Sequence, residues 1–230
     1  MSREIPMKSL AEDLRSFYLS KEYDEALFEV WERGEARGDS TTPSVCSPAY
    51  RTWMLEQLRT ALAKADGGSL LSLGAGNAFI ERILVDEGYD VLAVDFLQSA
   101  VDVALRATVP AIREDIRTWD PGSRWDVVYA DGLLGHLYGG EGGCTEVLAR
   151  MRSWLTSPGA LIVSNDAPPS AATATAQPAP GVNGFNWLSI PLLVSEMKDA
   201  GFDHVEAADF WYERPISGPR QRAIVTGRID

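Results

Sequence analysis

Cysteine and histidine are both scarce, with two of each among 230 residues. Cys46 and Cys144 are too few for a disulfide framework or a cysteine-based metal cluster. No apolar run approaches the roughly 20 residues needed to cross a bilayer. The opening residues, MSREIPMKSLAEDL, also lack the uninterrupted apolar core of a signal peptide. These absences predict a cytoplasmic protein that does not enter a membrane.

Positive charge is also in short supply. Lysine and arginine number 21 against 33 aspartates and glutamates, which gives a net charge of −12. So acidic a chain repels phosphate backbones, and we therefore expect a small molecule as its partner rather than a nucleic acid. The length suits one domain of ordinary size, present as a monomer or a homodimer.

From Ser69 onward, short apolar runs alternate with amphipathic stretches. Five runs predict buried strands, at 70–73, 91–94, 110–113, 126–130 and 160–164. Four amphipathic stretches predict helices, at 78–87, 98–106, 145–155 and 191–200. Two further extended runs, 202–213 and 222–229, read as a closing hairpin. We therefore predict an α/β fold with a doubly wound, Rossmann-like, mostly parallel sheet of seven strands whose last strand is antiparallel.

The segment before this pattern is helical in spacing. Apolar residues recur at helical intervals over 9–33, which predicts one long helix, and 34–48 reads as a loop with two prolines. A second helix is expected over 49–65. One later segment is unlike the rest, because 167–181 is rich in alanine and proline and has no large apolar side chain. We expect it to be a mobile loop.

The strongest chemical signal is a glycine turn after the first buried strand. Gly74 and Gly76 stand between that strand and a predicted helix, and Asp95 ends the next strand. Glycines let a backbone approach a ligand closely, and the helix N-terminus offers free N–H groups. A carboxylate at the end of the second strand can accept both hydroxyls of a ribose. The pattern predicts an adenosine site.

Two ligand classes use this layout, dinucleotides and S-adenosylmethionine. The dinucleotide fingerprint has a third glycine at a position where this chain has Phe79. The terminal hairpin also does not suit a simple six-stranded dinucleotide fold. The sequence therefore disfavours an NAD(P)-dependent oxidoreductase, which remains the alternative.

With these motifs, residues 49–229 resemble the class I S-adenosylmethionine-dependent methyltransferases, in particular the small-molecule type that tailors natural products. The resemblance rests on the glycine motif at 72–78, on Asp95, on the acidic turn at 114–116 and on the segment 126–137. Two positions depart from the family, which usually has an acidic residue at Ser72 and often a glycine at Ala78. The resemblance leaves open a protein of this fold that binds the cofactor without methylating.

The resemblance implies S-adenosylmethionine as the cofactor and a set of residues that contact it. These are Arg51, Leu73, Gly74, Ala75, Gly76, Asp95, Phe96, Glu114, Asp115, Ile116, Ala130 and Asp131. The segment 21–29 looks like the lid helix of small-molecule members. We therefore expect 1–48 to be a helical lid and substrate cover, and 49–230 to be the cofactor-binding domain.

On the acceptor side, His136 follows the strand 126–130 at a place where many relatives keep a residue facing the transferred methyl group. We expect it to be the catalytic base, and His204 to be a surface residue. Six aromatic residues fall in segments that the fold places over the cofactor. These expected substrate contacts are Tyr18, Tyr23, Trp53, Phe185, Trp187 and Trp211.

A magnesium site is a further alternative. Asp131, Asn165 and Asp166 stand where catechol-type methyltransferases hold Mg²⁺, and oxygen ligands are what this ion prefers. Because the surrounding residues do not match that subgroup, we predict no bound metal. The expected reaction is methyl transfer to an oxygen or nitrogen atom of a small metabolite in bacterial secondary metabolism.

Overall fold

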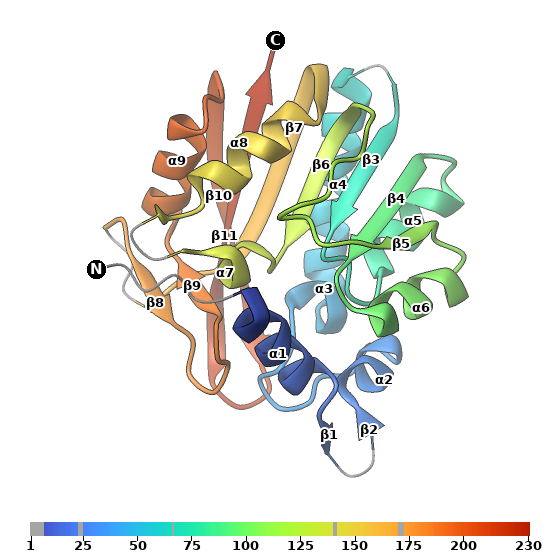
Figure 1. Ribbon diagram of the computed structural model, residues 1–230, viewed down its shortest axis with the longest axis vertical. Helices are drawn as coiled ribbons and strands as arrows, with labels where there is room; N and C mark the ends of the chain where they lie inside the picture. The colour runs from blue at the N-terminus through green and yellow to red at the C-terminus, as the bar shows by residue number, and fades with distance from the viewer. Residues whose placement is uncertain (1–6, 23–24, 66, 140–141, 170–172) are drawn as a thin grey trace.

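A seven-stranded sheet forms the centre of the protein in the computed structural model, which describes residues 7–22, 25–65, 67–139, 142–169 and 173–230 (Figure 1). The strands are β3 (Ser69–Leu73), β4 (Asp90–Asp95), β5 (Ala111–Arg113), β6 (Trp125–Asp131), β7 (Leu155–Asp166), β10 (His204–Arg214) and β11 (Gly218–Ile229). Their spatial order is β10-β11-β7-β6-β3-β4-β5. β11 runs antiparallel to both of its neighbours, β7 and β10, whereas the other neighbouring strands of this sheet pair in parallel. The predicted α/β fold with an antiparallel last strand is confirmed.

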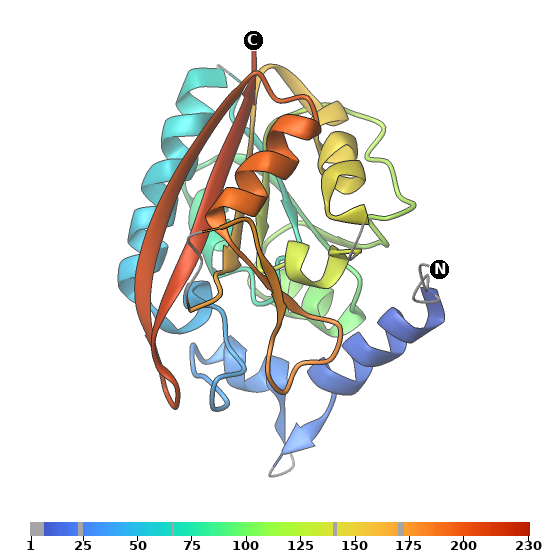
Figure 2. The ribbon, with the colours of Figure 1, turned by 90° about the vertical axis from the view of Figure 1, so that its left-hand side faces the viewer.

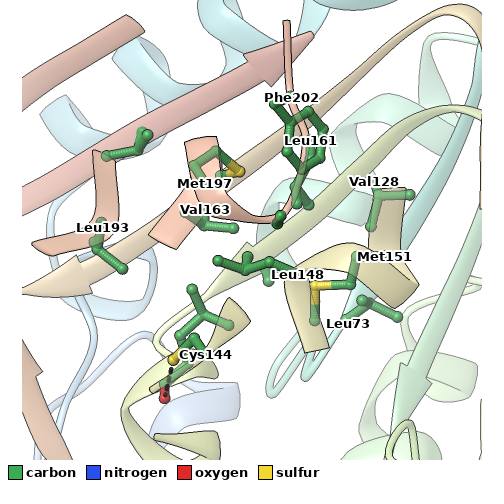
Figure 3. Close-up of a cluster of buried hydrophobic side chains, with 14 of the residues drawn as sticks. Leu73, Val128, Cys144, Leu148, Met151, Leu161, Val163, Leu193, Met197 and Phe202 are labelled. Carbon is green, nitrogen blue, oxygen red and sulfur yellow. Dashed lines mark hydrogen bonds between the residues drawn. The ribbon is translucent and has the colours of Figure 1, made fainter. Parts of the chain in front are cut away.

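Helices cover both faces of the sheet (Figures 1 and 2). One face carries α4 (Pro48–Ala65), α5 (Phe79–Asp86) and α6 (Gln98–Arg106), and the other carries α8 (Thr145–Ser153) and α9 (Ile190–Asp199). Strand β3 is therefore apolar on both sides: Leu70 packs toward α4, while Leu71 and Leu73 pack toward α8 and α9. Figure 3 shows Leu73 in this second cluster beside Leu148 and Met151.

The N-terminal segment differs from the prediction of one long helix. It forms α1 (Met7–Tyr18), the short pair β1 (Lys21–Glu22) and β2 (Glu25–Ala26), and α2 (Leu27–Glu32). A continuous helix would separate Tyr18 and Phe28 by about 15 Å along its axis. Their rings instead stack with centroids 5.6 Å apart, because the break lets α2 fold back against α1. The predicted loop also contains a short helix, α3 (Pro43–Cys46).

Part of the alanine- and proline-rich segment is ordered into a strand. Strand β8 (Ala176–Pro178) pairs antiparallel with β9 (Asn186–Leu188), which contributes the buried Trp187 and Leu188. The sequence pattern missed β8 because its stability comes from the partner strand rather than from its own side chains. Whether 167–181 moves stays a prediction.

Short elements gather at the end of the sheet where β3, β4 and β6 finish. Figure 1 shows α1, α3 and α7 (Leu134–Leu137) at this end, with β8 and β9 beside them. Open α/β sheets bind ligands at the carboxyl ends of their strands. No helix in the described part of the chain is both long and apolar enough to span a membrane.

Candidate functional site

The glycine turn and the acidic end of the next strand meet directly. Gly74 and Gly76 have φ angles of +67° and +57°, which side chains rarely adopt. The Gly74 amide donates to the carbonyl of Val94 at 2.7 Å. Asp95 accepts from the Gly76 amide at 3.3 Å and from the Leu97 amide at 2.9 Å. The turn and the carboxylate therefore form one rim, as predicted.

A cavity opens over this rim, and its lining is strongly acidic. The predicted cofactor residues that line it are Gly74, Ala75, Gly76, Asp95, Phe96, Glu114, Asp115, Ile116 and Asp131. Glu81 adds a fifth carboxyl group, whereas Arg117 is the one arginine or lysine among the described lining residues. Arg117 is already paired with Asp115 at 2.6 Å. We call this space the acidic cavity.

Burial keeps two of these carboxyl groups from ionising easily. Desolvation raises the pKa of Asp95 to about 6, against hydrogen bonds from nearby amides that lower it. Desolvation raises the pKa of Glu81 to about 7, although the hydroxyl of Ser72 donates to it at 2.5 Å. Glu81 thus brings an acidic group from α5 to the position where the family usually has one at Ser72.

Sequence reasoning missed Glu81, although a signal was present. It stands three residues before Leu84, on the face of α5 that also buries Ile80, so its side chain had to be buried. It likewise missed Tyr129, whose hydroxyl is buried in the lining. Among the described residues, neither this hydroxyl nor the buried Oδ2 atom of Asp131 in the same lining has a hydrogen-bond partner. These atoms are ready to bind a polar ligand.

Three predicted cofactor residues do not bring their side chains to the acidic cavity. Leu73 and Ala130 are fully buried in the core toward α8 and α9, because their side chains alternate away from it. The Arg51 guanidinium donates to the carbonyls of Ser44 and Val45 at 3.1 and 2.7 Å, so it holds α3 against α4.

Two predicted substrate contacts, Trp53 and Trp211, are not brought to the site either. Trp53 packs on Phe210 of the edge strand β10, with 5.7 Å between ring centroids, and does not line the acidic cavity. Trp211 is 60% exposed and donates to Asp209. Tyr23 lies outside the described residues. The sequence did not show which face of its helix or strand each of these aromatic residues occupies.

A second cavity adjoins the first. The two share Tyr18, Trp31, Thr42, Gly132 and His136 in their linings. The second is lined by the predicted substrate residues Phe185 and Trp187 and by three arginines, Arg214, Arg220 and Arg222. We call it the arginine cavity. Arg220 and Arg222 stand two apart on β11 and so share one face of the sheet, a signal that the sequence offered and that we did not use.

His136 lies at the junction of the two cavities. Its Nε2 atom is 3.0 Å from the hydroxyl of Tyr18, and its ring packs on Phe185 with centroids 4.7 Å apart. Desolvation lowers the pKa of His136 to about 4, opposed by an interaction with the Gly184 backbone. Burial and the charge of Asp95 raise the pKa of Tyr18. At neutral pH both groups are therefore uncharged. His204 is exposed, as expected.

Four charged residues form the ion cluster between the cavities: Asp131, Asp166, Arg214 and Arg222. Arg222 is 1% exposed and donates to both aspartates, and Arg214 donates to Asp166. The pairing of β11 with β7 sets Arg222 opposite Asp166. The alternative of a magnesium site is not supported, because the Arg222 guanidinium lies between the carboxylates of Asp131 and Asp166. In the described part of the chain, no group of three or more His, Cys, Asp or Glu is placed to hold a metal.

Comparisons with known proteins agree with this geometry. No protein-family model matches the chain. It is 36% identical over 211 residues to the "Tabtoxin biosynthesis enzyme" of Pseudomonas amygdali pv. tabaci, covering 90% of this chain and 82% of that protein.

Solved structures are similar in fold. Magnesium protoporphyrin IX methyltransferase from Synechocystis PCC 6803, with bound S-adenosylmethionine, has a TM-score of 0.63 at 15% identity and covers 96% of this chain and 97% of its own. The 1,6-didemethyltoxoflavin N1-methyltransferase of Burkholderia thailandensis has a TM-score of 0.56 at 18% identity and covers 83% and 92%. The predicted resemblance to this fold is confirmed.

Proposed function

This chain belongs to the protein family of the tabtoxin biosynthesis enzyme, and we propose that it is an S-adenosylmethionine-dependent methyltransferase. It transfers the methyl group to an oxygen or nitrogen atom of a small metabolite in bacterial secondary metabolism. The observation that carries the proposal is the junction of an acidic and an arginine-lined cavity at His136. One cavity suits the methyl donor and the other the acceptor.

The acidic cavity fits this cofactor. S-adenosylmethionine carries a sulfonium and an ammonium group against one carboxylate, so its net charge is opposite to that of the lining. The turn at Gly74 and Gly76 admits close approach of the backbone, and Asp95 stands ready for the ribose hydroxyls. The unpartnered Tyr129 hydroxyl and Asp131 Oδ2 would bind the ammonium group.

The bound cofactor supplies an electrophilic methyl group, and the chain supplies position and proton removal. An acceptor O–H or N–H in the arginine cavity gives its proton to the Tyr18 oxygen while the phenol proton passes to Nε2 of His136. The imidazole is uncharged near neutrality, so it is free to accept that proton. The buried rings of Phe28 and Trp31 exclude water from the junction.

The remaining predictions extend the proposal. Residues 1–48 act as the substrate cover of a cofactor domain at 49–230, supported by Tyr18 and Trp31 in both linings. The segment 167–181 moves to admit the acceptor, supported by the presence of 179–181 in the arginine cavity. We also expect a cytoplasmic monomer or homodimer that does not bind nucleic acid, and the net charge of −12 supports the last of these points.

Calorimetry tests the cofactor directly. We expect S-adenosylhomocysteine to bind and NAD⁺ not to bind, because the Phe79 ring packs beside Gly34 where a dinucleotide fingerprint has glycine. Asp95→Ala should weaken binding by about 1.5–3 kcal/mol, the range for hydrogen bonds to a charged group. Asp102→Ala, on the exposed side of α6, is the matched control. Tight nicotinamide binding would overturn the proposal.

Turnover needs its own assay. Metabolite extracts incubated with the enzyme and S-adenosylmethionine should yield a product heavier by one methylene group, detected by mass spectrometry. If the protein binds the cofactor but yields no such product with extracts from bacteria that make secondary metabolites, the result would favour a protein of this fold that does not methylate.

A further inference from the structure

Arg220 is a buried cation that forms no ion pair with any of the described residues. Its side chain is 9% exposed and lines the arginine cavity, with the guanidinium carbon 4.0 Å from the centroid of the Trp187 ring. Within the described residues it makes no side-chain hydrogen bond and no ion pair, and its Nε atom is buried without a partner. An unpaired buried charge is costly, so the site is built for a ligand that supplies the missing anion.

The other charged groups of the arginine cavity already have hydrogen-bond partners. Asp166 accepts from Arg222 and Arg214. Asp39 accepts from the backbone amides of Ile216 and Ser217, and these bonds help to lower its pKa. With Asp131 on the far side of Arg222, the ion cluster holds two cations and two anions. Arg220 is therefore the charged side chain of this lining that has no hydrogen-bond or ion-pair partner, so far as the chain is described.

We propose that Arg220 binds a carboxylate of the methyl acceptor, so that the acceptor is an acidic small molecule. This rests on the proposed function, which assigns the arginine cavity to the acceptor. Stacking on Trp187 fixes the guanidinium plane and leaves its N–H edge free for a bidentate pair with a planar carboxylate. A single guanidinium can offset the one negative charge of a carboxylate but not both charges of a phosphate dianion.

Strand β9 connects this anchor to the reacting end. Phe185 packs on His136 just before the strand begins, and Trp187 packs on Arg220 two residues later. An acceptor held by its carboxylate at Arg220 lies along this aromatic wall toward the Tyr18–His136 pair. The carboxylate is thus the anchor, and a different atom of the acceptor receives the methyl group.

Benzoate and benzamide test the charge requirement, because they share a flat ring and differ in the anionic group. We would measure both by ligand-observed NMR titration of the full chain saturated with S-adenosylhomocysteine. Benzoate should bind wild type at least about 10-fold tighter than benzamide, as expected for hydrogen bonds to a charged group. Arg220→Gln should abolish this preference, and Arg220→Lys should keep only part of it, since lysine lacks the planar fork.

Arg228→Gln is the matched control. It removes the same charge from the same strand, but Arg228 pairs with Glu206 outside both cavities, so the benzoate preference should be kept. Equal affinity for benzoate and benzamide in wild type, or a preference kept in Arg220→Gln, would overturn the proposal. Tighter binding of phenyl phosphate than of benzoate would overturn the carboxylate in favour of a phosphate.

The two proposals fail separately. Calorimetry with S-adenosylhomocysteine on each variant measures cofactor binding in the acidic cavity. If wild type does not bind S-adenosylhomocysteine, that result counts against the methyltransferase. The benzoate titration, repeated without S-adenosylhomocysteine, still decides on Arg220. If Arg220→Gln does not fold, the wild-type discrimination and the Arg220→Lys variant decide.

Discussion

The two cavities that meet at His136 differ in charge although they share five lining residues. The acidic cavity has five carboxyl groups, and two of them are held partly protonated near neutrality by burial. The arginine cavity has three guanidinium groups and two carboxylates. In a chain of net charge −12, a basic pocket is not a consequence of composition.

The ion cluster separates the two environments. Arg222 presents its charge to Asp131 of the acidic cavity and to Asp166 of the arginine cavity. Arg222 thus gives the carboxylate on each side the cationic partner that a buried charge needs. Under the two proposals, a cationic donor and an anionic acceptor would meet at His136 while their sites stay distinct.

The largest expected effect follows from breaking the ion cluster. Arg222→Met leaves Asp131 without its buried cation, and we expect the free energy of unfolding to fall by about 3–5 kcal/mol. Urea denaturation measures the loss. Asp131→Asn added to Arg222→Met should recover part of it, because the two changes are coupled.

Arg228→Gln is the control for that experiment, since its surface ion pair with Glu206 is worth about 1 kcal/mol or less. If Arg222→Met cost no more than this control, the cluster would not be what separates the cavities.

The next effect is on catalysis at the junction. His136→Ala should lower kcat by about 10²-fold while S-adenosylhomocysteine binds normally. We take the lower end of the range for general-base catalysis, because an imidazole with a pKa of about 4 is a weak base. The kcat of wild type should be flat from pH 6 to 9, as His136 protonates only in more acidic solution.

Two variants sharpen this result. Tyr18→Phe should lose a comparable factor, because the proton passes through its hydroxyl, whereas His204→Ala on the surface should change little. If His136→Ala kept at least a tenth of the wild-type kcat, no base would be required and the acceptor atom would already be ionised.

The smallest effect concerns the pH dependence of the acidic cavity. Because the pKa of Glu81 rises from 4.5 to about 7 on folding, the folded protein holds this proton more tightly, and stability falls as pH rises through that window. Glu81→Gln removes this loss. Thermal melts should show it stabilising the ligand-free protein by roughly 2 kcal/mol at pH 8 and little at pH 4.5.

Glu114→Gln provides the comparison for Glu81, since Glu114 lines the same cavity but is exposed. Equal effects of the two substitutions at pH 8 would show that burial is not what raises the pKa of Glu81.

The sequence by itself predicted the alternation of strands and helices, the antiparallel close and the rim at Gly74 and Asp95. These features are local or follow from strand order, because apolar periodicity and glycine turns act over a few neighbouring residues. The α6 helix was even predicted at its observed ends, 98–106. The family resemblance supplied the place of His136, and the structure brings it to the junction.

Tertiary structure alone decided the rest. Tyr18 meets His136 across 118 residues, and Arg222 meets Asp131 across 91, so no short pattern records either pair. The same holds for the break in the N-terminal helix, for β8, for the packing of Trp53 on Phe210 and for the exposure of Trp211. A side chain's pKa, partner and direction depend on what the fold packs around it, and burial is a property of the assembled core rather than of the residue.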